Sequence, residues 1–488
     1  MNKQIVRLYG FVLLLFVFLV AFTSRWAVLE ADELEDETDN RRPLIEEQRI
    51  ERGTITSADG TLIAESERAG GGVFVRTYPT GALFGNPVGY SFVDVGRIGI
   101  ESSENDLLSG EQNEFASIID QLSGSTREGA DITLTLDAGA QRVAVDALQS
   151  ALSSTPGAEG GGSVVALEPD TGAVKVMASV PGYDPNAVQD EATFQQLRTD
   201  EAAPLLNRPT QSTYQPGSTM KVVTAVAALD SGEFTPDTTL EANSGVEISG
   251  VPLANSGGQD FGTIDMTTAL TNSVNTYWAQ VGEELGTDTM VEYMERFGFY
   301  ADPELDYPDN QMRASGPYNS DGRLVTEGFD VGRVAIGQGG EEGQLLSAPM
   351  QMAEVAAAVA NGGKLMKPTF LQEASDPDGR QIAELDPDEQ SEVMSDETSA
   401  QVTELMVGVA NDGTASGLST SLGQLAGKTG TAEINVEEGL NRPWFIGFAP
   451  AEDPQIAVAA MLEQCTGCFG GEVAGPVAMQ VMDALAGS

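Results

Sequence analysis

The sequence predicts an α+β protein with a membrane anchor, a β-rich N-terminal module and a larger domain. That domain combines a five-stranded antiparallel sheet, flanking helices and a large helical subdomain. Three observations support this: an apolar run near the N-terminus, strand-like segments in two distant parts of the chain, and a mostly helical pattern between them. The predicted organisation is a cytoplasmic tail (1–7), a transmembrane anchor (8–29), an acidic juxtamembrane linker (30–50), the N-terminal module (51–155) and the main domain (156–488).

The anchor is predicted from an apolar run between Leu8 and Phe22, preceded by Lys3 and Arg7. The run is shorter than the roughly 20 residues of a typical span. A snorkelling Arg25 and an interfacial Trp26 would complete it. Basic residues before the run and acidic residues after it predict a cytoplasmic N-terminus and an external body. A cleavable signal peptide is the alternative, but no Ala-x-Ala site follows the run, which favours a retained anchor.

The N-terminal module is expected to be rich in short strands. Apolar alternation on both sides of Asp59-Gly60 predicts a hairpin. Asp137 is then expected to cap an amphipathic helix whose apolar positions include Ala147 and Leu148. The segment from Thr155 to Ser163, which reads TPGAEGGGS, is interpreted as a flexible turn or linker.

The main sheet is predicted from early and late strands. Val164–Leu167 and Val174–Val180 flank Pro-Asp-Thr-Gly, which indicates a hairpin. A last helix, Val477–Leu485, follows Gly475-Pro476. The late strand-like runs are Leu425–Ala432, Trp444–Ala449 and Ile456–Leu462. We expect the two early and three late strands to form one antiparallel sheet, with the segment from about 200 to 415 inserted between them as a mostly helical subdomain.

Composition narrows the chemistry. The formal net charge is −49, with 74 acidic against 25 basic residues, which disfavours nucleic acid and anionic lipid surfaces as partners of the main body. The acidity fits either an ordinary solvated surface or adaptation to high salt.

The chain has no histidine, so mechanisms with an imidazole base and histidine-based zinc sites are excluded. Cys465 and Cys468 are interpreted as a small disulfide or as two inert thiols.

The first chemical motif is Ser218-Thr219-Met220-Lys221, which follows Gln215-Pro216-Gly217 at a point where a helix can begin. Residues three apart share a face of a helix, so Lys221 would reach the Ser218 hydroxyl. Burial and a nearby cation would lower the pKa of Lys221, and a lysine base is one of the few ways to activate a serine without histidine. N–H groups at the helix N-terminus would hold a developing oxyanion.

The second motif is Ser273-Val274-Asn275. A hydroxyl at Ser273 would relay a proton between Lys221 and a leaving amine, and the Asn275 amide would hold both the lysine and a substrate carbonyl. Read alone, the motif is two polar residues in a loop or at a helix end.

The third motif, Lys428-Thr429-Gly430-Thr431, lies in a predicted strand. Lys428 would neutralise a substrate carboxylate, while Thr429 and Thr431 would add hydroxyl donors. Gly430 would let a substrate backbone lie close to the strand. The Thr431 amide would complete an oxyanion hole with that of Ser218. Read alone, this motif is a turn at a strand end.

The three motifs in this order are those of β-lactamases and penicillin-binding proteins. Longer strings surround them along nearly the whole chain. Together they resemble a class B penicillin-binding protein of the actinobacterial penicillin-binding protein A type. The strings include Asn40-Arg41-Arg42, Arg52 to Ile55, Arg76 to Pro79, Gly99-Ile100-Glu101, Tyr183 to Asn186, Tyr214 to Ser218, Ile336 to Gly339, Pro349 to Ala353, Gly427 to Glu433 and Trp444 to Pro450.

The resemblance implies a serine-type peptidoglycan D,D-transpeptidase, an acyltransferase that β-lactams inhibit by acylating Ser218. Ser218, Lys221 and Ser273 would be the catalytic residues. It implies no metal or organic cofactor. It implies a membrane glycosyltransferase of the shape, elongation, division and sporulation type as partner. The protein would act in cell-wall synthesis during growth or division. The substrate-binding residues would be Asn275, Lys428, Thr429, Gly430 and Thr431.

Other functions share parts of this pattern. A D,D-carboxypeptidase would pass the acyl group to water, and a β-lactamase would hydrolyse the antibiotic, although the anchor and N-terminal module argue against the latter. A non-catalytic β-lactam-binding scaffold is disfavoured by the intact motifs. The sequence departs from the family at Asn441-Arg442-Pro443, where relatives often have a histidine, and in its Cys465/Cys468 pair.

Overall fold

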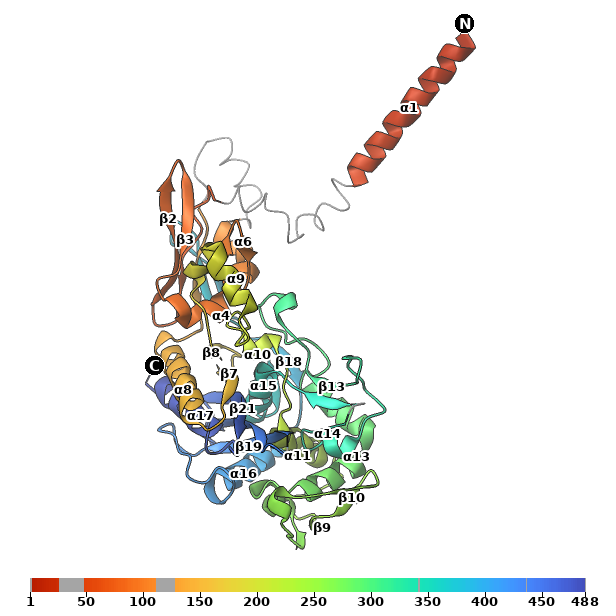
Figure 1. Cartoon of the computed structure of the whole chain (residues 1–488), viewed down its shortest axis with the longest axis vertical. Helices are drawn as coiled ribbons and strands as arrows, with labels where there is room; N and C mark the ends of the chain where they lie inside the picture. Colours follow the sequence, from red (N-terminus) through yellow and green to blue (C-terminus); the bar gives the residue numbers. More distant parts are fainter. Residues whose placement is uncertain (1, 26–47, 111–127, 341–342, 436, 488) are drawn as a thin grey trace.

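The computed structural model describes residues 2–25, 48–110, 128–340, 343–435 and 437–487 (Figure 1). Predictions made for Trp26, for Asn40-Arg41-Arg42 and for the acidic linker as far as residue 47 lie outside these ranges.

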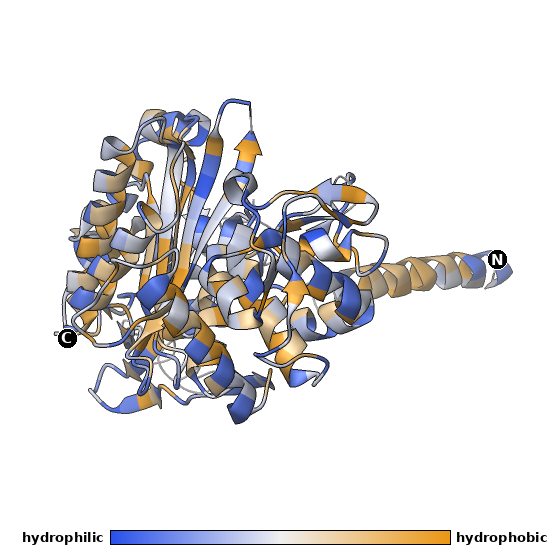
Figure 2. Cartoon of the chain, turned by 90° about the horizontal axis from the view of Figure 1, so that it is seen from below, coloured by the Kyte–Doolittle hydropathy of each residue, from blue (hydrophilic) through white to orange (hydrophobic). Residues whose placement is uncertain are grey.

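Helix α1, Asn2–Ser24, corresponds to the predicted anchor. Within Lys3–Ser24, the most apolar 18-residue window has a mean hydropathy of 2.6, and the apolar character of the helix is evident in Figure 2. Within the described ranges it is the helix long and apolar enough to cross a membrane. α1 is therefore a candidate membrane span.

The N-terminal module is built on a twisted sheet whose strand order is β17-β16-β6-β1-β2-β3. The predicted hairpin around Asp59-Gly60 is confirmed, because β1 and β2 pair antiparallel. β16 and β17 come from a segment that the sequence analysis assigned to the main domain, so the sheet joins the two regions. The strands are β1 (Ile55–Thr56), β2 (Leu62–Gly70), β3 (Val73–Thr77), β6 (Asp131–Leu134), β16 (Leu371–Ser375) and β17 (Gln381–Glu384). Between β3 and β6 lie η2 (Gly81–Phe84), α4 (Gly85–Val88), β4 (Ser91–Phe92), β5 (Gly96–Arg97), α5 (Ile100–Ser103) and α6 (Asn105–Ser109).

A buried ion cluster holds this module together. Glu101 is fully buried, and its carboxylate accepts from Arg52 Nε at 2.7 Å and from Arg76 Nε at 2.6 Å. Tyr78 Oη donates to the same carboxylate at 3.1 Å. Burial opposes ionisation of Glu101, but the Arg76 and Arg52 guanidiniums outweigh it and hold its pKa at about 2. The cluster therefore ties α5 to the segment before β1 and to β3.

The predicted main sheet is confirmed, with the antiparallel order β19-β20-β21-β7-β8. Val164, Val176, Phe445 and Val458 are fully buried, which agrees with the apolar runs that predicted the strands. The strands are β7 (Glu159–Leu167), β8 (Val174–Val180), β19 (Ala426–Asn435), β20 (Leu440–Ala449) and β21 (Ile456–Thr466).

Helices cover both faces of this sheet. α8 (Ala138–Ser154) begins at Asp137, whose carboxylate accepts from the Ala140 N–H as predicted. α8 packs against α17 (Ala474–Leu485), as Figure 1 shows. Adjacent residues of β7 identify the two faces: the Cα of Gly162 faces Leu148 of α8, and that of Gly161 faces Arg208 of α10 (Arg208–Gln211).

Helices are the main regular elements of the inserted region, as predicted, with short two-stranded sheets added to them. α9 (Glu191–Thr199) precedes the region, and its larger helical elements are η4 (Gly217–Met220), α11 (Lys221–Asp230), α12 (Met266–Thr271), α13 (Asn275–Arg296), α14 (Val331–Val334), α15 (Pro349–Ala360) and α16 (Asp396–Asp412). The paired short strands are β9 (Leu240–Glu241) with β12 (Thr263–Ile264), β10 (Val246–Ile248) with β11 (Val251–Leu253), β13 (Gly316–Tyr318) with β14 (Gln344–Leu346), and β15 (Lys364–Met366) with β18 (Glu389–Glu392).

Two predicted boundaries were wrong. The segment from Thr155 to Ser163 is not a linker throughout, because β7 already begins at Glu159 and its glycines pair with β21 and β8. The last helix begins at Ala474, before Gly475-Pro476, because a proline near the start of a helix costs no intrahelical hydrogen bond.

We predict that Glu101→Gln destabilises the protein. Removing the acid takes the shared carboxylate away from two buried guanidiniums, which should lower the free energy of unfolding by about 3–5 kcal/mol. Denaturant unfolding of residues 48–488 measures this, with the exposed Glu67→Gln as matched control.

The same pair tests the pH dependence of the cluster. The pKa of Glu101 is depressed from 4.5 to about 2, so its contribution is present above pH 4.5 and is lost as the pH falls towards 2. The stability difference between wild type and Glu101→Gln should narrow in that window. Equal stability losses for the Glu101 and Glu67 variants would contradict this role of the cluster.

Candidate active site

Ser218 lies in the 3₁₀ turn η4, directly before α11, where the sequence predicted the start of a helix. Gly217 has a φ of 55°, and its N–H donates to the Gly337 carbonyl at 3.1 Å. A Cβ on Gly217 would lie 3.0 Å from the backbone nitrogen of Ala432. The turn is thus pressed between β19 and the segment around Gly337, which sets the position of Ser218.

Lys221 is fully buried, and its amine is surrounded by neutral oxygen atoms. Nζ lies 2.7 Å from the Ser273 carbonyl, 2.7 Å from Asn275 Oδ1 and 3.0 Å from Ser218 Oγ. The first two are acceptors only, so in a neutral amine they would take both N–H groups and leave the lone pair for the Ser218 hydroxyl. Asn275 is oriented for this, because its Nδ2 donates to the Ala254 carbonyl at 3.2 Å.

Ser273 has an unusual backbone conformation. It lies between α12 and α13 with a φ of 57°, in the left-handed region that costs a non-glycine residue about 1 kcal/mol or more. This conformation turns both its carbonyl and its hydroxyl towards the lysines. Ser273 Oγ lies 2.8 Å from Lys428 Nζ and 3.3 Å from Lys221 Nζ. Ser273 therefore bridges the two amines.

Lys428 is also fully buried, on β19. Burial lowers the pKa of Lys428 to about 7. Burial, and then the Lys428 charge, lower the pKa of Lys221 well below its usual range. At neutral pH the site can thus hold one neutral amine, suited to accept a proton, beside an amine that still carries charge part of the time.

The strand residues after Lys428 have neighbours that the sequence did not suggest. Thr429 Oγ1 lies 2.6 Å from Thr414 Oγ1, in the segment after α16, and Thr431 Oγ1 accepts from the Gly470 N–H at 3.3 Å. A Cβ on Gly430 would lie 2.8 Å from the Pro216 carbonyl oxygen, so this strand position packs directly on the loop before Ser218.

The structure brings together the predicted residues of all three motifs. Ser218, Lys221, Ser273, Asn275 and Lys428 form one hydrogen-bonded cluster. Thr429, Gly430 and Thr431 continue β19 from Lys428, and Gly430 and Thr431 border the turn that carries Ser218. The oxyanion hole assigned to the Ser218 and Thr431 amides stays a prediction.

Sequence reasoning missed the residues that support the loop before Ser218. Trp444 Nε1 donates to the Gln215 carbonyl at 2.9 Å. Tyr214 Oη donates to Glu463 Oε1 at 2.7 Å, and the Arg442 guanidinium lies 5.0 Å from the centre of the Tyr214 ring. Tyr214 and Trp444 belong to strings noted in the sequence, but nothing in their pattern showed that they meet.

Comparison with known proteins places these features in a family. The penicillin binding protein transpeptidase domain matches residues 162–483, and the penicillin binding protein A dimerisation domain matches residues 52–132. The chain is 32% identical to the peptidoglycan D,D-transpeptidase PbpA of Mycolicibacterium smegmatis, over 98% of this chain and 97% of that protein. It is 31% identical to the PbpA of Mycobacterium tuberculosis, over 99% of each.

Solved structures of penicillin-binding proteins superpose on this chain. The ceftriaxone acyl-enzyme complex of penicillin-binding protein A from M. tuberculosis superposes with a TM-score of 0.79 at 30% identity, covering 90% of this chain and 99% of that one. Pseudomonas aeruginosa PBP2 in complex with WCK 5153 superposes with a TM-score of 0.71 at 29% identity, covering 89% and 96%.

Proposed function

The chain belongs to the penicillin-binding protein transpeptidase family, and we propose that it is a peptidoglycan D,D-transpeptidase that cross-links stem peptides through an acyl-enzyme on Ser218. The observation that carries this proposal is the position of the Lys221 amine: Nζ lies 3.0 Å from Ser218 Oγ and 2.7 Å from each of two acceptors, the Ser273 carbonyl and Asn275 Oδ1. Two facts about related proteins support it. The mycobacterial relatives are named peptidoglycan D,D-transpeptidases, and one superposed structure is an acyl-enzyme complex with a β-lactam.

Acylation follows from this geometry. Ser218 Oγ attacks the carbonyl carbon of the penultimate D-Ala and transfers its proton to the Lys221 lone pair. The carbonyl oxygen becomes an oxyanion, which the Ser218 and Thr431 amides stabilise. When the tetrahedral intermediate collapses, the peptide bond breaks and the terminal D-Ala leaves as an amine. The proton passes from Lys221 through the Ser273 hydroxyl, which lies 3.3 Å from Lys221 Nζ, to that amine.

Deacylation reverses the roles. The amine of a neighbouring stem peptide attacks the ester carbonyl and loses its proton to Lys221, and Ser218 Oγ departs and regains a proton. Asn275 positions the donor peptide. The C-terminal carboxylate of the donor is recognised by Lys428, Thr429 and Thr431, and Gly430 leaves room for its backbone.

The first test is intact-mass spectrometry of the full-length protein with benzylpenicillin. We expect a stable one-to-one adduct in the wild type and none in Ser218→Ala, because the variant lacks the nucleophile. Exposed Ser150→Ala serves as matched control and should be acylated normally. Hydrolysis of the antibiotic without a lasting adduct would indicate a β-lactamase, and neither adduct nor hydrolysis would indicate a non-catalytic scaffold.

The pH dependence of acylation tests the two lysines. Lys221 must be neutral to accept a proton and Lys428 must be charged to bind a carboxylate. The second-order acylation constant should therefore rise as Lys221 deprotonates and fall as the pH passes about 7, the pKa of Lys428. In Lys428→Arg the falling limb should disappear below about pH 10, because arginine keeps its charge.

Stopped-flow acylation across the pH range provides these profiles, with the exposed Lys364→Arg as matched control. A falling limb that is unchanged in Lys428→Arg would show that another group titrates there.

We also propose that α1 anchors the protein with its N-terminus in the cytoplasm and its catalytic domain outside. A membrane glycosyltransferase of the shape, elongation, division and sporulation type would be its partner, contacting α1 and the N-terminal module. The basic residues Lys3 and Arg7 at the start of α1 support this orientation. Proteolysis of intact spheroplasts should digest the catalytic domain while protecting a tag placed before Asn2, and protection of the catalytic domain would contradict the orientation.

A further inference from the structure

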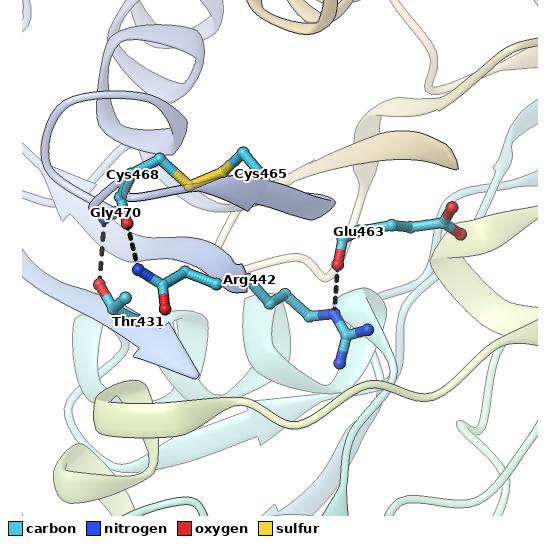
Figure 3. Close-up of a disulfide and its surroundings, with 7 residues drawn as sticks. Thr431, Arg442, Glu463, Cys465, Cys468 and Gly470 are labelled. Carbon is cyan, nitrogen blue, oxygen red and sulfur yellow. Dashed lines mark hydrogen bonds between the residues drawn. A yellow bond between two sulfur atoms is a disulfide. The ribbon is translucent and has the colours of Figure 1, made fainter. Parts of the chain in front are cut away.

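A disulfide next to the candidate active site joins the end of β21 to the connection that leads to α17. Cys465 and Cys468 are bonded, with their Cα atoms 5.9 Å apart, and both are buried. Figure 3 shows the bond beside Thr431 and Gly470. We call residues 465–470 the disulfide turn. The disulfide turn supplies none of the groups named in the reaction described above.

The turn is fixed to the neighbouring hairpin at two points. The Gly467 N–H donates to the Gly439 carbonyl at 2.8 Å, and Asn441 Nδ2 donates to the Cys468 carbonyl at 3.1 Å. Gly439 and Asn441 lie at the start of β20, which pairs with β19. The disulfide closes the loop from Cys465 to Cys468, which contains both contacts. It therefore restricts the backbone that leads to Gly470.

Gly470 lies directly on the strand that carries the third motif. A Cβ at this position would fall 2.1 Å from the Trp444 carbonyl oxygen and 2.4 Å from that of Gly430, so no side chain fits. This close approach lets the Gly470 N–H donate to Thr431 Oγ1 at 3.3 Å. A hydroxyl that accepts this N–H still has its own hydrogen to donate elsewhere.

We propose that the disulfide turn is a positioning element for the substrate carboxylate. It holds the Gly470 N–H on Thr431 Oγ1 and thereby orients the Thr431 hydroxyl hydrogen towards the carboxylate of the donor peptide or of a β-lactam. Gly470, Cys465 and Cys468 act through Thr431 and do not touch the substrate. The inference rests on the proposed transpeptidase function, since it names residues that serve the same site.

The geometry gives a reason for the disulfide at this place. A free threonine hydroxyl rotates, and ordering it on binding costs free energy. A hydrogen bond from a rigid backbone N–H removes part of that cost before the substrate arrives. Residues 467–473, between β21 and α17, form neither a helix nor a strand, so a covalent closure at the start of this segment supplies rigidity that regular structure would otherwise give.

The test compares two ligands that differ only at the carboxylate. Acylation of the full-length protein is measured with benzylpenicillin and with its methyl ester, in wild type and in Cys465→Ser/Cys468→Ser. One well-oriented hydrogen bond to a charged group accounts for about ten-fold in rate, so the double variant should lose about ten-fold with the acid and less than about two-fold with the ester. Thermal melting checks that the variant folds.

Two further variants locate the effect. In Thr431→Val, which lacks the hydroxyl, the disulfide substitutions should cause no additional loss with benzylpenicillin, because the group they orient is gone. Asn441→Ala keeps the disulfide but releases the Cys468 carbonyl, and should show the same preference for loss with the acid. If the double serine variant does not fold, Asn441→Ala tests the proposal in its place. Exposed Gly487→Ala is the control and should match wild type.

The outcomes are distinct. A selective loss with the acid, absent in the Thr431→Val background, supports the proposal. Equal losses with acid and ester, or no loss, would overturn it. If wild-type protein forms no adduct that depends on Ser218, the transpeptidase proposal itself fails, whereas normal acylation that is indifferent to the disulfide rejects the positioning role alone.

Discussion

The contact of Ser273 with two buried lysines is the interaction on which the site depends. Lys221 and Lys428 are both fully buried, and their amines contact neutral oxygens of serine, asparagine and threonine. Two full charges buried among neutral oxygens would cost much free energy. The pKa values of both lysines are lowered instead, and the amines contact hydroxyl, amide and carbonyl oxygens rather than a carboxylate. A carboxylate would favour the charged form of Lys221 and remove the free amine that the proposed reaction requires.

This arrangement is notable in a chain with a net charge of −49. Where an acid is buried with cations, as Glu101 is with Arg52 and Arg76, it remains ionised. Where burial outweighs the hydrogen bonds to the acid, the pKa is raised, as in Asp306, to about 6; burial and the Glu304 charge raise the pKa of Glu354 to about 8. The charge of the surface and the charge balance of the interior are therefore separate matters, and the cluster of Lys221 and Lys428 belongs to the interior.

The main sheet and the motif residues could be predicted from sequence because each signal is local. Apolar runs mark the strands, Asp137 marks the start of α8, and each motif lies within four residues. The supporting contacts could not be predicted. The contacts of Thr414 with Thr429, of Gly470 with Thr431 and of Trp444 with Gln215 each join a loop to a strand by a single hydrogen bond, and no sequence periodicity predicts them. The glycines at the start of β7 suggested a linker for a similar reason, since only pairing with neighbouring strands makes them part of a strand.

The hairpin of β16 and β17 has a consequence for how the molecule can be divided. β16 pairs with β6, so a strand from beyond residue 370 completes a sheet that begins at residue 55. A protein cut near residue 155 would expose the pairing edges of β6 and β16, and unpaired strand edges are prone to aggregate. The two regions are linked by backbone hydrogen bonds between strands as well as by the continuous chain, so force applied to the N-terminal module would be transmitted to the transpeptidase domain through β6 and β16.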